Sequence, residues 1–221
     1  MNAETSRNKR LRIMLADDHA IFSEALRGLL EKGYEIVGSV KDGRALLKQA
    51  PLLHPDLIVM DISMPLLNGL DAARRIRAIL PTVKIVFLTM QNDPNLAAAA
   101  STLGNVGFVL KGSSFSELQT AIEAVCQNKA YITPRLRAED WAVSIARARQ
   151  FSKDLSDRQK EIVQLLAEGF SAKEIGAQLN LSERTVTFHK YNIMNAFNLK
   201  SNAELVVFAI KRGLLLLRQD D

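Results

Sequence analysis

Carboxylate, hydroxyl and ammonium side chains stand at the ends of separate short apolar runs in the first half of the sequence. In chain order these side chains are Asp17 and Asp18, Asp61, Thr89 and Lys111. If the runs are neighbouring strands of one sheet, three carboxylates meet at one edge, where their like charges are costly unless a cation neutralises them. Mg²⁺ suits such a set, because it binds through few carboxylates and keeps water or phosphate oxygens as further ligands.

The same side chains suit phosphoryl transfer to a carboxylate. A carboxylate can be the nucleophile, and the transfer needs mainly positioning and charge neutralisation. Lys111 supplies a point charge for a phosphoryl oxygen, and Thr89 supplies a hydroxyl that could follow it. Each residue alone has a simpler explanation, since a lone Asp after a strand is commonly a helix cap or a solvated turn residue. Their occurrence at four strand ends favours the functional interpretation.

The elements that must position these residues form an alternating pattern over residues 1–127. The expected strands are Arg12–Ala16, Glu35–Val40, Leu57–Asp61, Lys84–Thr89 and Gly107–Leu110, and the expected helices are Ile21–Glu31, Gly43–Gln49, Leu70–Leu80, Asn95–Leu103 and Ser116–Gln127. The last three strands are almost wholly apolar, so helices should cover both faces of a parallel sheet. We therefore expect a doubly wound, flavodoxin-like α/β domain of five strands, with its site at the strands' carboxyl ends.

The rest of the chain has a different pattern. Residues 128–154 read as a linker, with a helix from Arg135 to about Arg149, and residues 155–221 read as an all-α domain of four helices. Three of these helices should begin with a capping box and the fourth with a capping serine, in the order Ser156, Ser171, Ser182 (the single cap) and Ser201.

Composition excludes several classes of protein. The net charge of +5 is spread thinly, with 15 Lys/Arg against 13 Asp/Glu before residue 131 and 14 against 11 after it, so charge alone does not indicate DNA binding. No apolar run approaches the roughly 20 residues of a membrane-spanning helix, so a cytoplasmic protein is expected. The single cysteine, Cys126, excludes an internal disulfide and a cysteine zinc cluster, and we expect it to be buried.

Four segments resemble the receiver domain of two-component signalling: Leu15–His19, Met60–Gly69, Leu88-Thr89 and Gly107–Lys111. The resemblance implies that Asp61 accepts a phosphoryl group from a histidine kinase. It also implies roles for the neighbouring groups: Asp18, Asp61 and the main-chain carbonyl of Ser63 as Mg²⁺ ligands, Asp17 acting through water, Lys111 contacting the phosphoryl oxygen, and Thr89 with Phe108 as a switch pair. His19 could serve as a second acid or base, but a residue beginning a helix beside the acidic pair is better explained as a positioning group or a surface residue that faces the kinase.

Residues 155–213 resemble the LuxR-type helix-turn-helix, which the NarL/FixJ class of regulators joins to a receiver. The segments that carry the match include Leu155–Arg158, Leu166–Gly169, Ser171–Gly176, Leu181–Val186 and Ala209–Gly213. The resemblance implies binding to double-stranded DNA, with a homodimer on the DNA. Phosphorylation would shift the domain arrangement or dimerisation, and so DNA binding, and the chain would be no enzyme beyond its own phosphoryl transfer and slow dephosphorylation.

Helical periodicity sorts the segment Ser182–Phe197 into two faces. Val186, Ile193 and Phe197 share one stripe, which should be core. The candidates for DNA contact lie on the remaining surface: Arg184, Thr187, Phe188, Lys190 and Tyr191. Six Lys/Arg against five Asp/Glu between residues 156 and 200 predict weak nonspecific binding per monomer, so a dimer should matter.

Several alternatives remain at this point. The apolar last helix offers Leu205, Val206 and Ala209 as dimer contacts, with a better-buried helix as the less favoured alternative. An aspartyl-phosphate enzyme of the haloacid dehalogenase type needs a second Asp two places after the nucleophile, where this chain has Ser63. A DNA-binding protein that ignores phosphorylation is less consistent with the complete acidic set, and RNA binding lacks the aromatic strand signatures of RNA modules.

Overall fold

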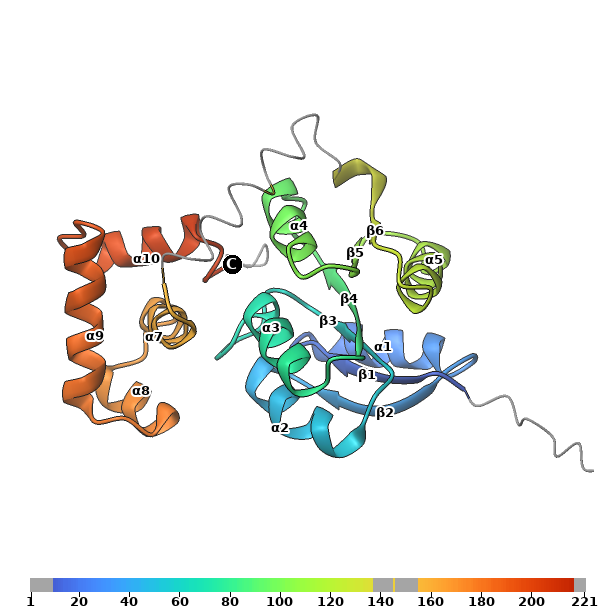
Figure 1. Ribbon diagram of the computed structural model, residues 1–221, viewed down its shortest axis with the longest axis horizontal. Coiled ribbons are helices and arrows are strands. Elements are labelled where there is room, and N and C mark those ends of the chain that lie inside the picture. The colour runs from blue at the N-terminus through green and yellow to red at the C-terminus, as the bar shows by residue number, and fades with distance from the viewer. Residues whose placement is uncertain (1–9, 137–144, 146–154, 217–221) are drawn as a thin grey trace, which may run out of the picture.

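The computed structural model describes residues 10–136, 145 and 155–216. Its first part contains a parallel sheet of six strands in the order β2-β1-β3-β4-β5-β6 (Figure 1). The strands are β1 (Arg12–Ala16), β2 (Glu35–Val40), β3 (Leu57–Met60), β4 (Lys84–Thr89), β5 (Gly107–Leu110) and β6 (Tyr131–Ile132). The five strands expected from the sequence are confirmed, and β6 is an addition to them.

Helices cover both faces of this sheet. They are α1 (Ala20–Leu30), α2 (Gly43–Leu53), α3 (Gly69–Ile79), α4 (Pro94–Ser101) and α5 (Phe115–Cys126). Because side chains alternate along a strand, Met14 and Ala16 of β1 pack with α2, α3 and α4, whereas Ile13 and Leu15 pack with α1 and α5. The two-sided burial explains why the central strands are apolar throughout.

The sixth strand lies in the segment that the sequence assigns to the linker. This strand pairs with β5. The N–H of Tyr131 donates to Val106 O at 3.0 Å, and the N–H of Thr133 donates to Phe108 O at 2.9 Å. A short 3₁₀ helix, Pro134–Leu136, follows and ends in a buried leucine. The α/β domain therefore extends to residue 136, and the helix expected from Arg135 to about Arg149 falls almost entirely outside the described residues.

The C-terminal domain consists of α7 (Asp157–Ala167), α8 (Ala172–Leu179), α9 (Glu183–Ala196) and α10 (Asn202–Lys211). The capping boxes at Ser156 and Ser171 are both present. At Ser201 only half of the box forms, because the hydroxyl accepts from Glu204 N but the Glu204 carboxylate accepts from Lys200 N instead. Ser182 caps α9 by accepting from Thr185 N, as the sequence predicts.

Two apolar clusters stabilise the C-terminal domain, and one of them reaches the first domain. The first, around Val163, joins α7 to α9 and α10, and the second, around Ile175, joins α7, α8 and the start of α9. Leu66, from the loop after β3, packs against the second cluster. The two domains therefore share an apolar contact next to the carboxyl edge of the sheet.

Two further expectations can be compared with the structure. Cys126 is exposed at the end of α5, so the prediction that it is buried is wrong; its position at the helix end, next to Gln127, removes it from the apolar face. Among the described residues, every helix is too short or too polar to cross a membrane.

Candidate functional site

The four strand ends singled out by the sequence meet at one edge of the sheet. Their main chains continue the strand pairing by one residue, which fixes where each side chain starts. The N–H of Asp17 donates to Val40 O at 2.9 Å, that of Asp61 to Ala16 O at 2.8 Å and that of Lys111 to Thr89 O at 2.8 Å. Because β1, β3, β4 and β5 are neighbours, the side chains project into one small volume.

Lys111 holds two of the carboxylates together. Its Nζ lies 2.7 Å from Asp61 Oδ2 and 2.8 Å from Asp17 Oδ2, and all three side chains are almost completely buried. Burial raises the pKa of Asp17 above its ordinary value, and the hydrogen bond and positive charge of Lys111 oppose that rise. Two carboxylates share one ammonium group here and Asp18 lies beside them, so a bound cation would offset the excess of acidic groups.

His19 belongs to this cluster, a position that the sequence left open. Its Nδ1 lies 3.1 Å from Asp17 Oδ1, 3.3 Å from Asp18 Oδ1 and 3.8 Å from Asp61 Oδ2. One ligand atom from each of the four residues lies within 4.8 Å of all the others. Carboxylate oxygens are the ligands that a hard divalent cation such as Mg²⁺ prefers, so the donor types of this cluster suit such an ion.

The remaining groups of the expected site surround Asp61. The Ser63 N–H donates to Asp61 Oδ1 at 3.1 Å, which orients the carboxylate. Thr89 is fully buried, and its hydroxyl accepts from Gln91 N at 3.1 Å. Phe108 is also fully buried, with its ring centroid 6.4 Å from that of Phe87. The ring of Phe108 therefore lies inside the domain and packs beside Phe87.

The candidate DNA-contacting residues lie on one side of α9. Arg184 is exposed, as are Phe188 (62%) and Tyr191 (58%), whereas Thr187 and Lys190 are half-buried. On the opposite stripe Val186 and Ile193 are buried, as the periodicity predicts, and Phe197 is half-buried. In Figure 1, α9 lies on the far side of the C-terminal domain, with α7 nearer the sheet domain, so the exposed face is free of the described part of that domain.

The candidate dimer contacts divide into two groups. Leu205 (2% exposed) and Ala209 pack into the core of their own domain, which fits the alternative of a better-buried helix. Val206 is half-buried, and the neighbouring Val207 is 49% exposed. Leu205 and Ala209 are thus explained by the fold of one chain, and a contact with a second chain through α10 would use Val207.

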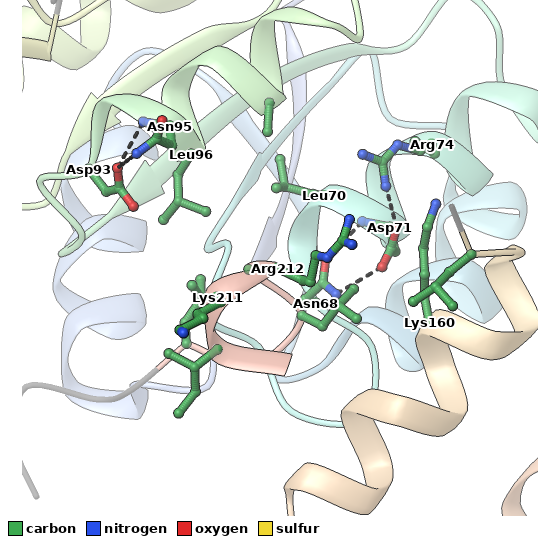
Figure 2. A pocket seen from close by; sticks show the side chains of 16 residues that line it. Asn68, Leu70, Asp71, Arg74, Asp93, Asn95, Leu96, Lys160, Lys211 and Arg212 are labelled. Carbon is green, nitrogen blue, oxygen red and sulfur yellow. Dashed lines mark hydrogen bonds and ion pairs between the residues drawn. The ribbon is translucent and has the colours of Figure 1, made fainter. Parts of the chain in front are cut away.

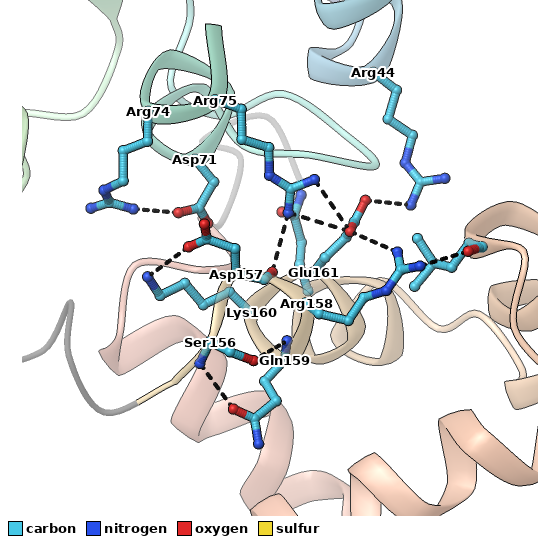
Figure 3. Close-up of polar contacts among 12 residues, drawn as sticks. Arg44, Asp71, Arg74, Arg75, Ser156, Asp157, Arg158, Gln159, Lys160 and Glu161 are labelled. Carbon is cyan, nitrogen blue, oxygen red and sulfur yellow. Dashed lines mark hydrogen bonds and ion pairs between the residues drawn. The ribbon is translucent and has the colours of Figure 1, made fainter. Parts of the chain in front are cut away.

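A charged contact between the domains was not foreseen from the sequence (Figure 3). Glu161 of α7 is buried and forms three ion pairs. Its Oε1 lies 2.9 Å from Nη2 of Arg44 in α2, and its Oε2 lies 3.3 Å from Nη2 of Arg75 in α3 and 3.2 Å from Nη1 of Arg158 in its own helix. Arg44 also donates to Gln178 O at 2.9 Å, and Arg75 donates to Asp157 O at 3.2 Å. No sequence pattern indicates such a cluster, because it joins helices more than 80 residues apart.

On the other side of this contact the domains are separated by a cavity of about 430 Å³ (Figure 2). It lies between α3 and α4 of the first domain and α7 and the end of α10, and its polar lining includes Asn68, Asp71, Arg74, Lys160, Lys211 and Arg212. Asp71 is already engaged by Arg74 and by the amide of Asn68. The domains are therefore joined closely along α2 and α3 and loosely beside α4.

Comparison with known families matches both parts of the chain. The family described as response regulator receiver domain matches residues 13–123, and the family described as bacterial regulatory proteins, luxR family, matches residues 153–209. The chain is 32% identical over 209 residues to the response regulator UvrY of Escherichia coli K12, covering 92% of this chain and 95% of UvrY. It is 33% identical over 215 residues to the oxygen regulatory protein NreC of Staphylococcus carnosus, covering 93% and 99%.

Solved structures that are similar to this chain over most of its length include those of RcsB. The response regulator RcsB of Salmonella typhimurium, described for its conformational dynamism in DNA interaction, is 27% identical with a TM-score of 0.63, covering 92% of this chain and 98% of RcsB. A structure of two RcsB dimers bound to two parallel DNAs is 28% identical with a TM-score of 0.53, covering 90% and 97%.

Proposed function

The chain belongs to the response regulators that join a receiver domain to a LuxR-type DNA-binding domain, and we propose that Asp61 is the residue its receiver phosphorylates. As a member of this family it is a DNA-binding transcriptional regulator and not a classical enzyme. The observation that carries the assignment of Asp61 is its ion pair with Lys111, which also pairs with Asp17. Asp61 is the carboxylate at the centre of the edge, between β1 and β4, and both its oxygens have donors.

The chemistry assigned to Asp61 is phosphoryl transfer from a histidine kinase. One carboxylate oxygen attacks the phosphorus of the kinase's phosphohistidine, so that a P–O bond forms while the P–N bond breaks and imidazole leaves with the electron pair. Lys111 stays close to the transferred oxygens and balances their charge. Thr89 donates its hydroxyl to one of those oxygens after transfer, and water later hydrolyses the acyl phosphate slowly.

The receiver of this chain fits Mg²⁺ by the chemistry of its donors. Asp18, Asp61 and the main-chain carbonyl of Ser63 would hold the ion directly, and Asp17 would hold it through water. Mg²⁺ supplies positive charge that offsets the repulsion among three carboxylates and an incoming phosphoryl group. His19, whose Nδ1 contacts Asp17 and Asp18, orients these carboxylates.

The proposed DNA interface is the exposed side of α9. Arg184 suits a phosphate or a guanine edge, Thr187 a base or a phosphate, and Phe188 the methyl group of a thymine. Lys190 suits a phosphate, and Tyr191 lies beside them on the same face. RcsB is described as bound to DNA as dimers, and we propose the same state for this chain, since a surplus of one positive charge between residues 156 and 200 gives one monomer few phosphate contacts.

The experiment that tests the assignment compares wild type with Asp61→Asn. Both are incubated with Mg²⁺ and a small phosphodonor such as acetyl phosphate, and intact mass is measured over time. Wild type should gain the mass of one phosphoryl group, and Asp61→Asn should gain none. An equal gain in both proteins would remove Asp61 from its role.

A further inference from the structure

The loop that carries Asp61 is hydrogen-bonded to a helix of the other domain. This loop, Asp61–Asn68, passes under α7, where Gln164 is only 2% exposed. The Gln164 Oε1 accepts from Asn68 N at 2.9 Å and from Asn68 Nδ2 at 3.1 Å, and its Nε2 donates to Met64 O at 3.2 Å and to Glu168 Oε1 at 2.8 Å. The amide thus uses its whole hydrogen-bonding capacity in a buried position, which makes it costly to alter.

A second contact in the same loop involves an unfavourable backbone. Leu66 has φ of +66°, and the N–H of Leu67 donates across it to Pro65 O at 2.7 Å. A tight turn with positive φ at a branched residue is rare and strained, and it persists only where its surroundings enforce it. Here those surroundings belong to the C-terminal domain: Glu168 accepts from Leu66 N at 3.2 and 3.3 Å, and the Leu66 side chain packs on the cluster around Ile175.

The far end of the loop returns to the phosphoacceptor. The Gly69 N–H donates to Ile62 O at 2.9 Å, and a Cβ at Gly69 would lie 2.2 Å from Asp61 O. Because the start of α3 lies directly against the main chain of Asp61, residues 62–68 form a short loop whose two ends are held together. A displacement of the Leu66 backbone should therefore displace Asp61, and a displacement of Asp61 should displace Leu66.

We infer that Leu66, Gln164 and Glu168 form a latch through which α7 positions the phosphoacceptor loop and slows its reaction while the domains are docked. The inference rests on the proposed function of Asp61. In the docked form the loop is held at Met64, Leu66 and Asn68, so it cannot follow Asp61 when a phosphoryl group is added without losing contacts to α7. Undocking removes the contacts that enforce the turn at Leu66, and the loop can then change conformation when Asp61 is phosphorylated. By reciprocity, phosphorylation of Asp61 lowers the docking equilibrium constant by the same factor by which docking disfavours phosphorylation.

The test uses the full chain and the variant Gln164→Glu. A carboxylate at this position loses both donors and faces Glu168 and Met64 O, so the latch should open. We expect phosphorylation by acetyl phosphate with Mg²⁺, followed by intact mass, to become about tenfold faster, as for a loss of one or two hydrogen bonds. Small-angle scattering should show Gln164→Glu expanded before phosphorylation and wild type expanded only after it.

The matched control is Gln159→Glu, the same change on the same helix. Gln159 takes part in the capping box of α7, where Glu serves equally well, so wild-type rates are expected. If Gln164→Glu fails to fold, Leu66→Ala tests the latch from the receiver, with exposed Leu52→Ala as its control, and the same acceleration is expected.

Two results overturn the inference and point to different causes. If Gln164→Glu and Leu66→Ala accept a phosphoryl group at the wild-type rate or more slowly, α7 does not slow the phosphorylation of Asp61. The assignment of Asp61 as the phosphoacceptor then still stands. If wild type itself accepts no phosphoryl group, the proposed function fails together with the latch.

Discussion

Lys111 is the residue on which the charge balance of the acidic cluster depends. Its ammonium group pairs with both Asp17 and Asp61, and it is buried with them. Removing one partner of a buried ion pair leaves an uncompensated charge, which costs more than the pair itself contributes. The cluster should therefore be most sensitive to loss of this single ammonium group.

We expect Lys111→Met to lower the free energy of unfolding by about 3 kcal/mol in the absence of Mg²⁺. Mg²⁺ should then stabilise Lys111→Met more than wild type, because the ion replaces the missing positive charge. Urea unfolding of both proteins with and without Mg²⁺ measures this difference. An equal Mg²⁺ effect in the two proteins, or a loss no larger than that of the exposed control Lys32→Met, would contradict it.

Glu174 supplies a test of helix capping at the same scale. The hydroxyl of Ser171 and then its main-chain N–H hold the pKa of Glu174 below its ordinary 4.5. A depressed pKa stabilises the folded state at higher pH, and this contribution is lost as pH falls below 4.5 and through the folded value. In Ser171→Ala the pKa should move part of the way back toward 4.5, followed by NMR titration of the carboxyl group. An unchanged pKa, as expected for the control Ser182→Ala, would refute the assignment.

The proximity of the residues at the strand ends could be predicted from the sequence, because a parallel sheet brings its carboxyl ends to one edge whatever the details of side-chain packing. Asp17, Asp61 and Lys111 were found in this way. His19 and Leu66 were not, since one depends on the path of a side chain and the other on a backbone conformation that the second domain imposes. The local sequence pattern indicates neither the path of a side chain nor a backbone conformation that another domain imposes.

At the scale of elements, α9 presents a polar and aromatic face whose residues differ in exposure. Arg184 is exposed, so its removal should leave the fold intact. We expect Arg184→Ala to weaken binding to specific DNA by about tenfold with unchanged thermal unfolding. Lys32→Ala removes the same charge from the receiver and should bind as wild type; equal losses in both would mean that only net charge matters.

The helix α10 allows burial and dimerisation to be separated. Leu205→Ala should lower the stability of the C-terminal domain by about 2–4 kcal/mol, because the side chain fills that domain's core. Val207→Ala should change stability by less than about 0.5 kcal/mol, because Val207 is half exposed. Denaturant unfolding measures both. A stable Leu205→Ala protein that no longer dimerises on DNA would return Leu205 to the interface.

Element boundaries followed from local signals where those signals were strong. The caps at Ser156, Ser171 and Ser182 fixed three helix starts, and alternating apolar runs fixed five strands. The strand Tyr131–Ile132 was missed because two residues give no periodicity, and only pairing with β5 defines it. Sequence pattern thus fails where an element is too short to show its repeat more than once.

At the scale of the whole molecule, the arrangement of the domains follows from contacts that sequence could not indicate. Three arginines surround Glu161, and Gln164 is buried on a face of α7 that otherwise reads as polar surface. These contacts leave the exposed side of α9 free. We therefore expect regulation in this arrangement to act through the phosphoacceptor loop and through dimerisation, rather than by covering the recognition helix.

We propose that modification of Asp61 controls DNA binding by the full chain. The most direct measurement is the DNA affinity of wild type and Asp61→Asn at fixed salt, with Mg²⁺, before and after treatment with acetyl phosphate. We expect treatment to strengthen DNA binding by about tenfold in wild type and to leave the affinity of Asp61→Asn unchanged. Equal affinities before and after treatment in a fully phosphorylated wild-type protein, or an equal rise in both proteins, would contradict it.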